Sequence, residues 1–291
     1  MNRRSFIRAG LAAAGTLFAV GSGENSGSDV GEKDATRWAF LADTHIPADV
    51  DNNYRGFYPY RNFQKVIPDI VSSSPDGVLI AGDLARLTGE LGDYVNLRNL
   101  LSPLAEKAPV VMALGNHDNR ENFRKTFDKT SGEKQAVSGK HVVVINKGPI
   151  RLIILDSLFY TDKVPGLLGK EQRQWLENHL KECDNTPAIL CFHHTLEDGD
   201  DDLLDVLRLF GMIESIQKVK AIVYGHSHKY AFSQYKGIHL INLPAVGFNF
   251  SDTEPVGWVE ARLSSQGGDF TLHAAGGNRD GDGRVTRLTW R

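Results

Sequence analysis

The sequence predicts an α/β fold, and two observations support this. Short continuous apolar runs recur along the chain, at 38–42, 78–81, 110–114, 142–145, 152–155, 188–192 and 221–224. Continuous rather than alternating hydrophobicity is typical of strands that are covered on both faces. Stretches with helical spacing lie between several of these runs. The chain has 291 residues, 41% of them hydrophobic and 24% charged, and this ordinary globular composition fits one large domain.

Three stretches carry the helical pattern. In the first, apolar residues follow the i, i+3, i+4, i+7, i+8 spacing of one helix face, at Phe63, Val66, Ile67, Ile70 and Val71. The other two are GKEQRQWLENHLKE at 169–182 and DLLDVLRLFGMIESIQ at 202–217. From about Ile238 onward the hydrophobicity alternates, which predicts antiparallel strands joined by turns.

The first residues have the anatomy of an export signal. Arg3, Arg4 and Arg8 precede an apolar stretch at 9–20, which is too short to span a bilayer. The segment NRRSFIR resembles the twin-arginine export motif. We therefore expect a signal peptide at 1–21, a flexible Gly/Ser/acidic linker at 22–35 and the folded domain at 36–291. The resemblance implies contact with the twin-arginine machinery, a periplasmic or extracellular location and no transmembrane anchor in the mature form.

Charge and cysteine content exclude some classes of function. The formal net charge is −3, so no basic field indicates a nucleic-acid-binding surface. The two cysteines, Cys183 and Cys191, form no C-x-x-C metal motif and can make no framework of disulfides.

Five of the apolar runs end in similar polar residues. The segments that follow them are DTH at 43–45, GD at 82–83, GNHD at 115–118, HH at 193–194 and GHSH at 225–228. Six of the ten histidines of the chain fall in these five segments. Open α/β sheets bind ligands outside the carboxyl ends of their strands, so we expect these side chains to meet in one site.

The residue types at these strand ends predict a metal centre. Imidazole and carboxylate together suit Fe, Mn, Zn, Ni or Co, whereas an all-oxygen set would suit Ca or Mg. Seven candidate ligands are too many for one tetrahedral ion, but they fit two ions that share a carboxylate. The candidates are Asp43, His45, Asp83, Asn116, His193, His226 and His228. Gly82, Gly115 and Gly225 are expected to let the backbone turn sharply without crowding the metals.

The order of these motifs resembles that of the calcineurin-like metallophosphoesterases, whose signature is D-x-H, G-D, G-N-H-[DE], a later His and G-H-x-H. The segment LDS at 155–157, followed by LLGKEQRQWLENHL, is similar to the bacterial branch with class III cyclic-nucleotide phosphodiesterases. The resemblance implies a four-layer αββα sandwich of two mixed β-sheets flanked by helices. The dinuclear metal site would lie at the carboxyl ends of the strands.

The resemblance also implies a role for each residue. The first ion would bind Asp43, His45 and His228, the second would bind Asn116, His193 and His226, and Asp83 would bridge them. His193 is preferred to His194 because the family ligand is the first histidine of an H-x-P-like element. His117 would contact the phosphate or protonate the leaving oxygen, and Asp118 would orient it. Asn116, His117 and His194 are the tentative substrate contacts.

The function implied is metal-dependent hydrolysis of a small phosphate ester by a metal-bridging hydroxide, with a phosphodiester favoured. A phosphomonoesterase or protein phosphatase using the same site is the alternative, and a metal-bearing scaffold without catalysis is a third reading. Arg86 stands where purple acid phosphatases carry a metal-bound tyrosine, which disfavours that subclass. The identity of the metals and the oligomeric state stay open.

One further motif lies near the C-terminus. Asn278, Asp280, Asp282 and Gly283 have the spacing of a calcium loop, but the terminal Glu of such a loop is absent and no second helix follows. A hairpin turn is the preferred interpretation of DGDG, with calcium binding as the alternative.

Overall fold

The computed structural model describes residues 34–127 and 131–291, so the predicted signal peptide and nearly all of the linker lie outside the described residues. The described helices are α2 (Pro59–Ser73), α3 (Leu91–Ala105), α4 (Arg120–Thr126), α5 (Lys170–Glu182) and α6 (Val206–Ile213). In these residues no helix combines the length and apolar character needed to cross a bilayer.

The strands form two mixed sheets. The six-stranded sheet has the order β13-β12-β11-β1-β2-β3, and the seven-stranded sheet has the order β4-β5-β6-β7-β8-β10-β9. The strands of the first are β1 (Thr36–Leu41), β2 (Gly77–Ala81), β3 (Val110–Ala113), β11 (Pro255–Leu263), β12 (Gly267–Gly277) and β13 (Val285–Thr289). Those of the second are β4 (Glu133–Lys134), β5 (Val143–Lys147), β6 (Ile150–Ile154), β7 (Ala188–Cys191), β8 (Val219–Tyr224), β9 (Ala231–Tyr235) and β10 (Ile238–Asn242).

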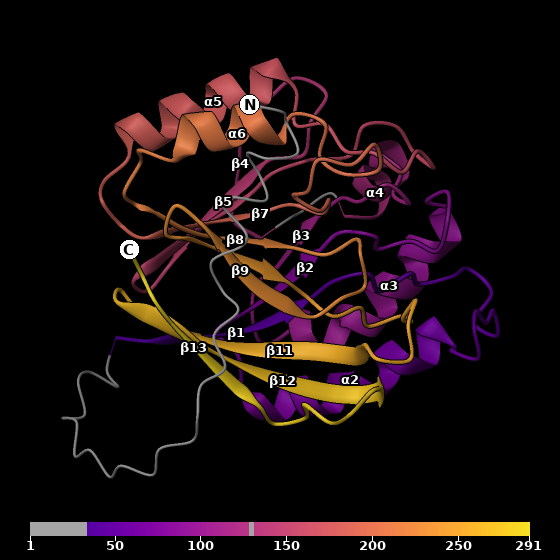
Figure 1. Ribbon diagram of the computed structural model, residues 1–291. Helices are drawn as coiled ribbons and strands as arrows, with labels where there is room; N and C mark the ends of the chain where they lie inside the picture. The colour runs from indigo at the N-terminus through magenta and orange to yellow at the C-terminus, as the bar shows by residue number, and fades with distance from the viewer. Residues whose placement is uncertain (1–33, 128–130) are drawn as a thin grey trace, which may run out of the picture.

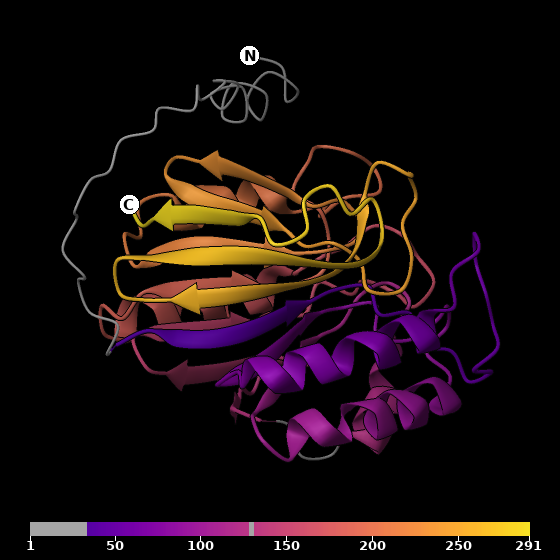
Figure 2. The ribbon, with the colours of Figure 1, turned by 90° about the horizontal axis from the view of Figure 1, so that it is seen from below.

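Three apolar clusters define the layers. One cluster lies between the sheets and joins residues such as Phe40, Ile189 and Phe270. The outer face of the seven-stranded sheet packs against α5 and α6, and the outer face of β1–β3 packs against α2, α3 and α4. Figure 1 shows α5 and α6 on one side of the stacked sheets, and Figure 2 shows α2 and α3 side by side on the other. The predicted αββα sandwich is confirmed.

Every one of the seven apolar runs overlaps a strand, because each is buried on both faces as its continuous hydrophobicity indicated. Two helices, α3 and α4, were not predicted. The third predicted helix is shorter than its apolar stripe, since Leu203 lies before α6 and Ile216 after it.

The antiparallel prediction for the C-terminal part is right for β11–β13 and holds for only one of the two neighbours of β10. Strand β10 pairs antiparallel with β9 but parallel with β8. Alternating hydrophobicity reports which face of a strand is buried and carries no information about the direction of the neighbouring strand.

The predicted hairpin near the C-terminus is confirmed, because β12 and β13 pair antiparallel across residues 278–284. Within this turn the Asp282 carboxylate accepts hydrogen bonds from the Ala274 amide and the Arg279 guanidinium. The Asn278 side-chain oxygen accepts one from the Asp280 amide.

Candidate metal centre

The five polar segments meet at the carboxyl ends of β1, β2 and β3 in one sheet and β7 and β8 in the other. The first segment runs parallel to the second beyond the ends of β1 and β2: the Asp43 and His45 amides donate to the carbonyls of Gly82 and Asp83, at 3.0 and 2.9 Å. Among the described residues, the groups that could hold an ion are Asp43 with His45 and His228, Asp83 with His193 and His226, and His45 with Asp83 and His117. These groups contain six of the seven predicted ligands, and the side-chain oxygen of the seventh, Asn116, lies 3.2 Å from His193 Nε2.

The backbone at this site is strained. Nine non-glycine residues of the described chain have positive φ, and five of them are predicted ligands. These five are Asp43, His45, Asp83, His226 and His228, with φ between 46° and 72°. Left-handed backbone costs a non-glycine residue about 1–3 kcal/mol and clusters at functional sites, so the fold holds these side chains in place at a cost in stability.

The glycines at the strand ends act differently from one another. Gly82 has φ 85°, and it is the only one of the predicted three with a positive value in the described chain. A Cβ on Gly115 would collide with the Asp83 carboxylate, and a Cβ on Gly225 would collide with that of Asp43. The backbone does turn after Gly115 and Gly225, whose carbonyls accept from the Asp118 and Ser227 amides at 3.1 and 2.9 Å, but without a positive φ at either glycine. Their missing Cβ makes room for the carboxylates of Asp83 and Asp43 rather than for the metals.

Each of the four histidines predicted as ligands is held by a backbone carbonyl. His45 Nδ1 lies 3.3 Å from the Arg86 oxygen, and His228 Nδ1 lies 2.6 Å from that of Phe248. The other two contacts join His193 Nδ1 to the Ala81 oxygen at 2.9 Å and His226 Nε2 to the Asp201 oxygen at 3.1 Å. A carbonyl only accepts, so each of these ring nitrogens carries the proton and donates. Sequence analysis missed these contacts because a backbone carbonyl carries no residue-type signal.

The second nitrogens of these rings face one another in pairs, and each is an acceptor where its ring is neutral. His45 Nε2 lies 3.1 Å from His228 Nε2. His193 Nε2 lies 3.1 Å from His226 Nδ1 and 3.2 Å from the Asn116 oxygen. Two lone pairs at this distance repel unless a proton or a cation lies between them. The donor set therefore fits two cations, one at each pair.

The carboxylates are placed to serve both pairs. Asp83 Oδ2 is 3.7 Å from His45 Nε2 and 3.3 Å from His193 Nε2, so one oxygen reaches each half of the centre. Asp43 Oδ1 lies 3.4 Å from His228 Nε2.

The charges of these groups are coupled. Burial alone would raise the pKa of the Asp83 carboxyl, but the neighbouring His193 holds it well below its usual value. Burial alone would lower the pKa of His193, but Asp83 raises it to about 9. Burial lowers the pKa of His45 to about 3 and that of His226 to about 4, so both rings are neutral at pH 7.

His117 and Asp118 do not contact each other as expected. The His117 ring donates from Nδ1 to the Leu87 oxygen at 2.8 Å. The Asp118 carboxylate instead accepts from the Leu84, Ala85 and Gly115 amides and from the Tyr94 hydroxyl. The expectation that Asp118 orients His117 is wrong, because three backbone amides saturate the carboxylate. Burial, together with the charge of Asp83, raises the pKa of Asp118 to about 7.

The tentative substrate contact of His194 is also contradicted. Its side chain is fully buried, and Nδ1 lies 2.7 Å from the Ser157 hydroxyl. The ring packs against those of His193 and His226 on the side away from solvent, so it supports ligands instead of lining the opening. His117, whose side chain keeps 23% of its surface exposed, is open to a substrate.

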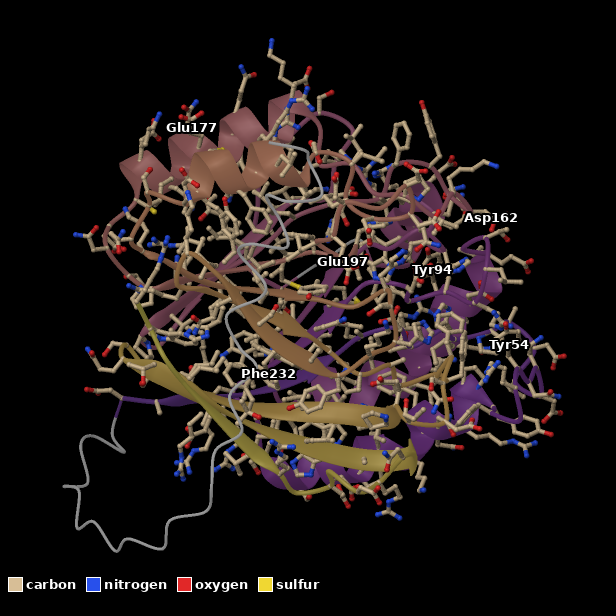
Figure 3. All side chains as sticks on the ribbon, viewed as in Figure 1. Tyr54, Tyr94, Asp162, Glu177, Glu197 and Phe232 are labelled. Atoms are coloured by element: carbon tan, nitrogen blue, oxygen red, sulfur yellow. The ribbon has the colours of Figure 1, made fainter. Side chains whose placement is uncertain are left out.

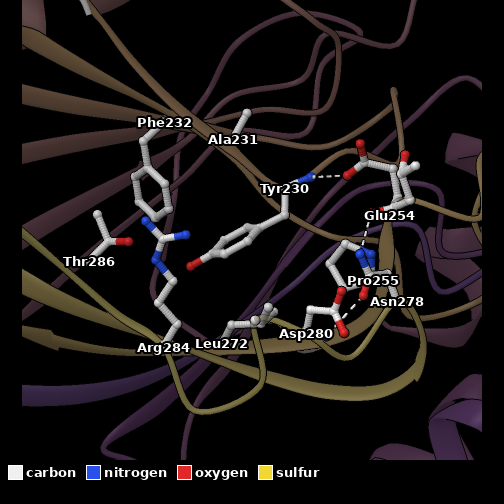
Figure 4. A pocket seen from close by; sticks show the side chains of 12 residues that line it. Tyr230, Ala231, Phe232, Glu254, Pro255, Leu272, Asn278, Asp280, Arg284 and Thr286 are labelled. Atoms are coloured by element: carbon white, nitrogen blue, oxygen red, sulfur yellow. Dashed lines mark hydrogen bonds between the residues drawn. The ribbon is translucent and has the colours of Figure 1, made fainter. Parts of the chain in front are cut away.

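A separate cavity of about 580 Å³ lies between β9, β11 and the turn of the β12–β13 hairpin. Figure 4 shows Arg284, Thr286 and the Tyr230 hydroxyl at one end of it, with Glu254 and Asp280 at the other. None of the predicted ligands lines this cavity.

Several known proteins are similar to this chain in sequence or in fold. A probable cyclic nucleotide phosphodiesterase of Vesicomyosocius okutanii is 27% identical to the chain over 234 residues, covering 78% of the chain and 93% of that protein. The 3′,5′-cyclic adenosine monophosphate phosphodiesterase CpdA of Haemophilus influenzae is 26% identical over 255 residues, covering 81% and 88%. The crystal structure of a dimetal phosphatase from Danio rerio has the same fold, with a TM-score of 0.68 at 15% identity over 88% of this chain and 99% of that one.

The match to a family profile carries the assignment further. Residues 36–230 match the profile described as calcineurin-like phosphoesterase, which is more than half of the chain and includes all five strand-end segments. The protein belongs to the calcineurin-like phosphoesterase family.

Proposed function

We propose that the protein hydrolyses small phosphodiesters, of the cyclic-nucleotide type, at a centre of two transition-metal ions. The observation that carries this proposal is the two pairs of facing imidazole nitrogens, which share the Asp83 carboxylate. Phosphate-ester hydrolysis is the chemistry that such paired sites perform. The names of the curated relatives favour a diester as the substrate.

The first ion would bind Asp43, His45 and His228, and the second would bind Asn116, His193 and His226. Asp83 would bridge them. When bound, two such ions supply an activated water as nucleophile and neutralise the charge that develops on the phosphoryl oxygens. With imidazole and carboxylate donors and no thiolate, Fe, Mn, Zn, Ni or Co would suit the site.

His117 would protonate the leaving oxygen. Its Nδ1 donates to the Leu87 carbonyl, which fixes the ring and leaves Nε2 as the atom that exchanges a proton with the substrate. The His117 amide donates to Asp83 Oδ1 at 2.9 Å. This hydrogen bond fixes the position of His117 relative to the carboxylate that would bridge the two ions. Asp118 would act indirectly, by holding the backbone of 84–85 and 115 in place.

The test compares three substrates on metal-loaded protein of measured metal content: bis(4-nitrophenyl) phosphate, 4-nitrophenyl phosphate and a 3′,5′-cyclic nucleotide. We expect two ions per chain and a kcat/KM for the diesters well above that for the monoester. A preference for the monoester would replace the diesterase by a phosphomonoesterase. Two bound ions with no turnover of any ester would replace the enzyme by a metal-bearing scaffold.

We also propose that the protein is exported by the twin-arginine machinery to the periplasm or beyond, on the strength of NRRSFIR at 2–8. Replacing Arg3 and Arg4 with Lys keeps the charge and removes the motif. Retention of that variant inside the cell, by fractionation, is the expected result, and unchanged export would contradict the twin-arginine route.

A further inference from the structure

Aromatic side chains gather on one side of the metal centre. The Phe248 ring is buried and packs on two predicted ligands, with its centroid 4.6 Å from that of His45 and 4.7 Å from that of His228. Phe250 stacks on the same His228, at 4.2 Å and an interplanar angle of 29°. Tyr54 meets the Phe248 ring at 4.8 Å and 62°.

Two of these rings face solvent. Phe250 keeps 51% of its surface exposed and Tyr54 keeps 40%, although Phe248 between them is only 3% exposed. One face of Phe250 is covered by His228, so its exposure lies on the opposite face. An exposed apolar ring against a predicted metal ligand offers a flat surface at the place where a substrate attached to the ions would lie.

The loop that carries Tyr54 is built to hold it. The Tyr54 and Phe57 backbones exchange two hydrogen bonds of 2.9 Å, and Arg55 and Gly56 between them have φ of 53° and 84°. Two central residues with positive φ form a tight hairpin turn. Figure 3 shows Tyr54 at the end of the molecule that carries this loop, beside the start of α2.

Arg86 adds a positive charge to the same surface. Its guanidinium lies 5.2 Å from the centroid of Tyr54 and 5.5 Å from that of Phe248. Its Nε donates to the Asn52 side chain, and the ion pairs formed among the described residues include none with Arg86. A half-buried guanidinium without a carboxylate partner, beside two aromatic rings, favours an electron-rich or anionic group.

From this arrangement we infer that Tyr54, Phe248, Phe250 and Arg86 form a binding subsite for a planar heteroaromatic group of the substrate. The group stacks on the open face of Phe250 and against Tyr54, while Arg86 meets acceptor atoms at its edge. The subsite lies on the side of Asp43, His45 and His228. On the side of Asn116 the loop with Tyr160 lies close by, but the ring of Tyr160 packs on Phe159, and among the described ring contacts none joins it to a predicted ligand. This inference rests on the proposed function and adds the residues that would select its substrate.

The test measures binding to the metal-loaded protein instead of turnover. Adenosine 5′-monophosphate and ribose 5-phosphate share the phosphate and the sugar and differ only in the planar base. Stacking of one base on aromatic side chains strengthens binding by roughly 5- to 150-fold, so the ratio of the two dissociation constants should fall in this range. Calorimetry on the wild-type protein gives this ratio.

Phe250→Ala and Tyr54→Ala should each lower this ratio toward one. Tyr160→Ala is the matched control, because Tyr160 is an aromatic residue that is 62% exposed beside the other half of the centre. We expect it to keep the wild-type ratio. All three side chains lie at the surface, so the variants should fold, and circular dichroism checks this.

Three results would overturn the subsite: a ratio near one in the wild type, an unchanged ratio in both Phe250→Ala and Tyr54→Ala, or a ratio that falls in Tyr160→Ala instead. Absence of binding by either compound would overturn it as well. Failure of the proposed function would give a different result, namely no turnover of bis(4-nitrophenyl) phosphate. The ratio of the two dissociation constants would still show whether the aromatic rings bind the base.

Discussion

The two halves of the metal centre use similar ligands in different surroundings. Around Asp43, His45 and His228 the second layer is aromatic, made by Phe248, Phe250 and Tyr54. We call this the aromatic half. Around Asn116, His193 and His226 the second layer is polar, made by Ser157, His194 and the Asp201 carbonyl, and we call this the polar half.

This difference in surroundings indicates that one half of the centre is suited to contact a substrate and the other half to orient the predicted ligands. The aromatic half keeps exposed rings beside its ligands, so it can contact the organic part of a substrate. The polar half buries a second imidazole and a hydroxyl behind its ligands, which fixes their orientation. Asp83 belongs to both halves, and His117 lies next to it.

The largest effect should come from the carboxylate that joins the halves. We expect Asp83→Asn to lower activity by more than about 100-fold, because a neutral amide cannot bridge two cations. This loss is larger than the roughly 10- to 100-fold loss that follows from removing a hydrogen-bond partner of a metal ligand. Metal content should fall below two ions per chain. The same change at the exposed Asp280 is the control. A folded Asp83→Asn protein with full turnover and two ions would contradict the two-metal centre.

The second largest effect should come from His117, and it should differ in kind from the effect of changing Asp118. His117→Asn should lower kcat by roughly 10²- to 10⁴-fold, the usual contribution of a general acid, without changing metal content or thermal stability. Asp118→Asn should instead lower the melting temperature, because it weakens the contacts to three backbone amides and the Tyr94 hydroxyl. Equal melting temperatures for both variants would show that Asp118 is not the support described above.

A change behind the polar half should affect one ion only. The Ser157 hydroxyl accepts from the His193 amide at 3.2 Å and contacts His194. Ser157→Ala should weaken one of the two ions by about 10- to 100-fold, as loss of a second-layer contact does, and leave the other unchanged. Titration with a chelator measures both affinities, and Ser102→Ala on the exposed face of α3 is the control. Equal weakening of both ions would mean that the halves are not independent.

The smallest effect is a pH dependence of loading in the polar half. The pKa of His193 is raised to about 9, so its ring holds a proton at pH 7 that an incoming ion must displace. The apparent affinity of that ion should therefore rise about tenfold per pH unit between pH 6 and 8 and flatten near 9. His45 in the aromatic half has its pKa lowered to about 3, so it releases no proton in this range. A proton-release measurement at pH 7 checks this, and zero protons released would contradict it.

Much of the fold and the site could be predicted from the sequence, because both rest on residue type and order. Doubly buried strands need continuous apolar runs, and all seven runs overlap strands. The gathering of the candidate ligands could be predicted because the carboxyl ends of neighbouring strands meet at one edge of a sheet. The direction of β10 could not be predicted, since its residues fit a parallel and an antiparallel neighbour equally well.

The sequence by itself determined which side chains meet and that their chemistry suits two ions. Only the tertiary structure decided how each side chain is held. His45 and His228 are 183 positions apart, and their Nε2 atoms face each other because the Nδ1 atoms are held by the carbonyls of Arg86 and Phe248. These carbonyl contacts do not depend on residue type, so the sequence does not predict them. The same is true of Asp118, which the fold turns toward backbone amides instead of His117. A motif specifies donors and acceptors, but the backbone groups that come within hydrogen-bonding distance of them depend on how distant strands pack.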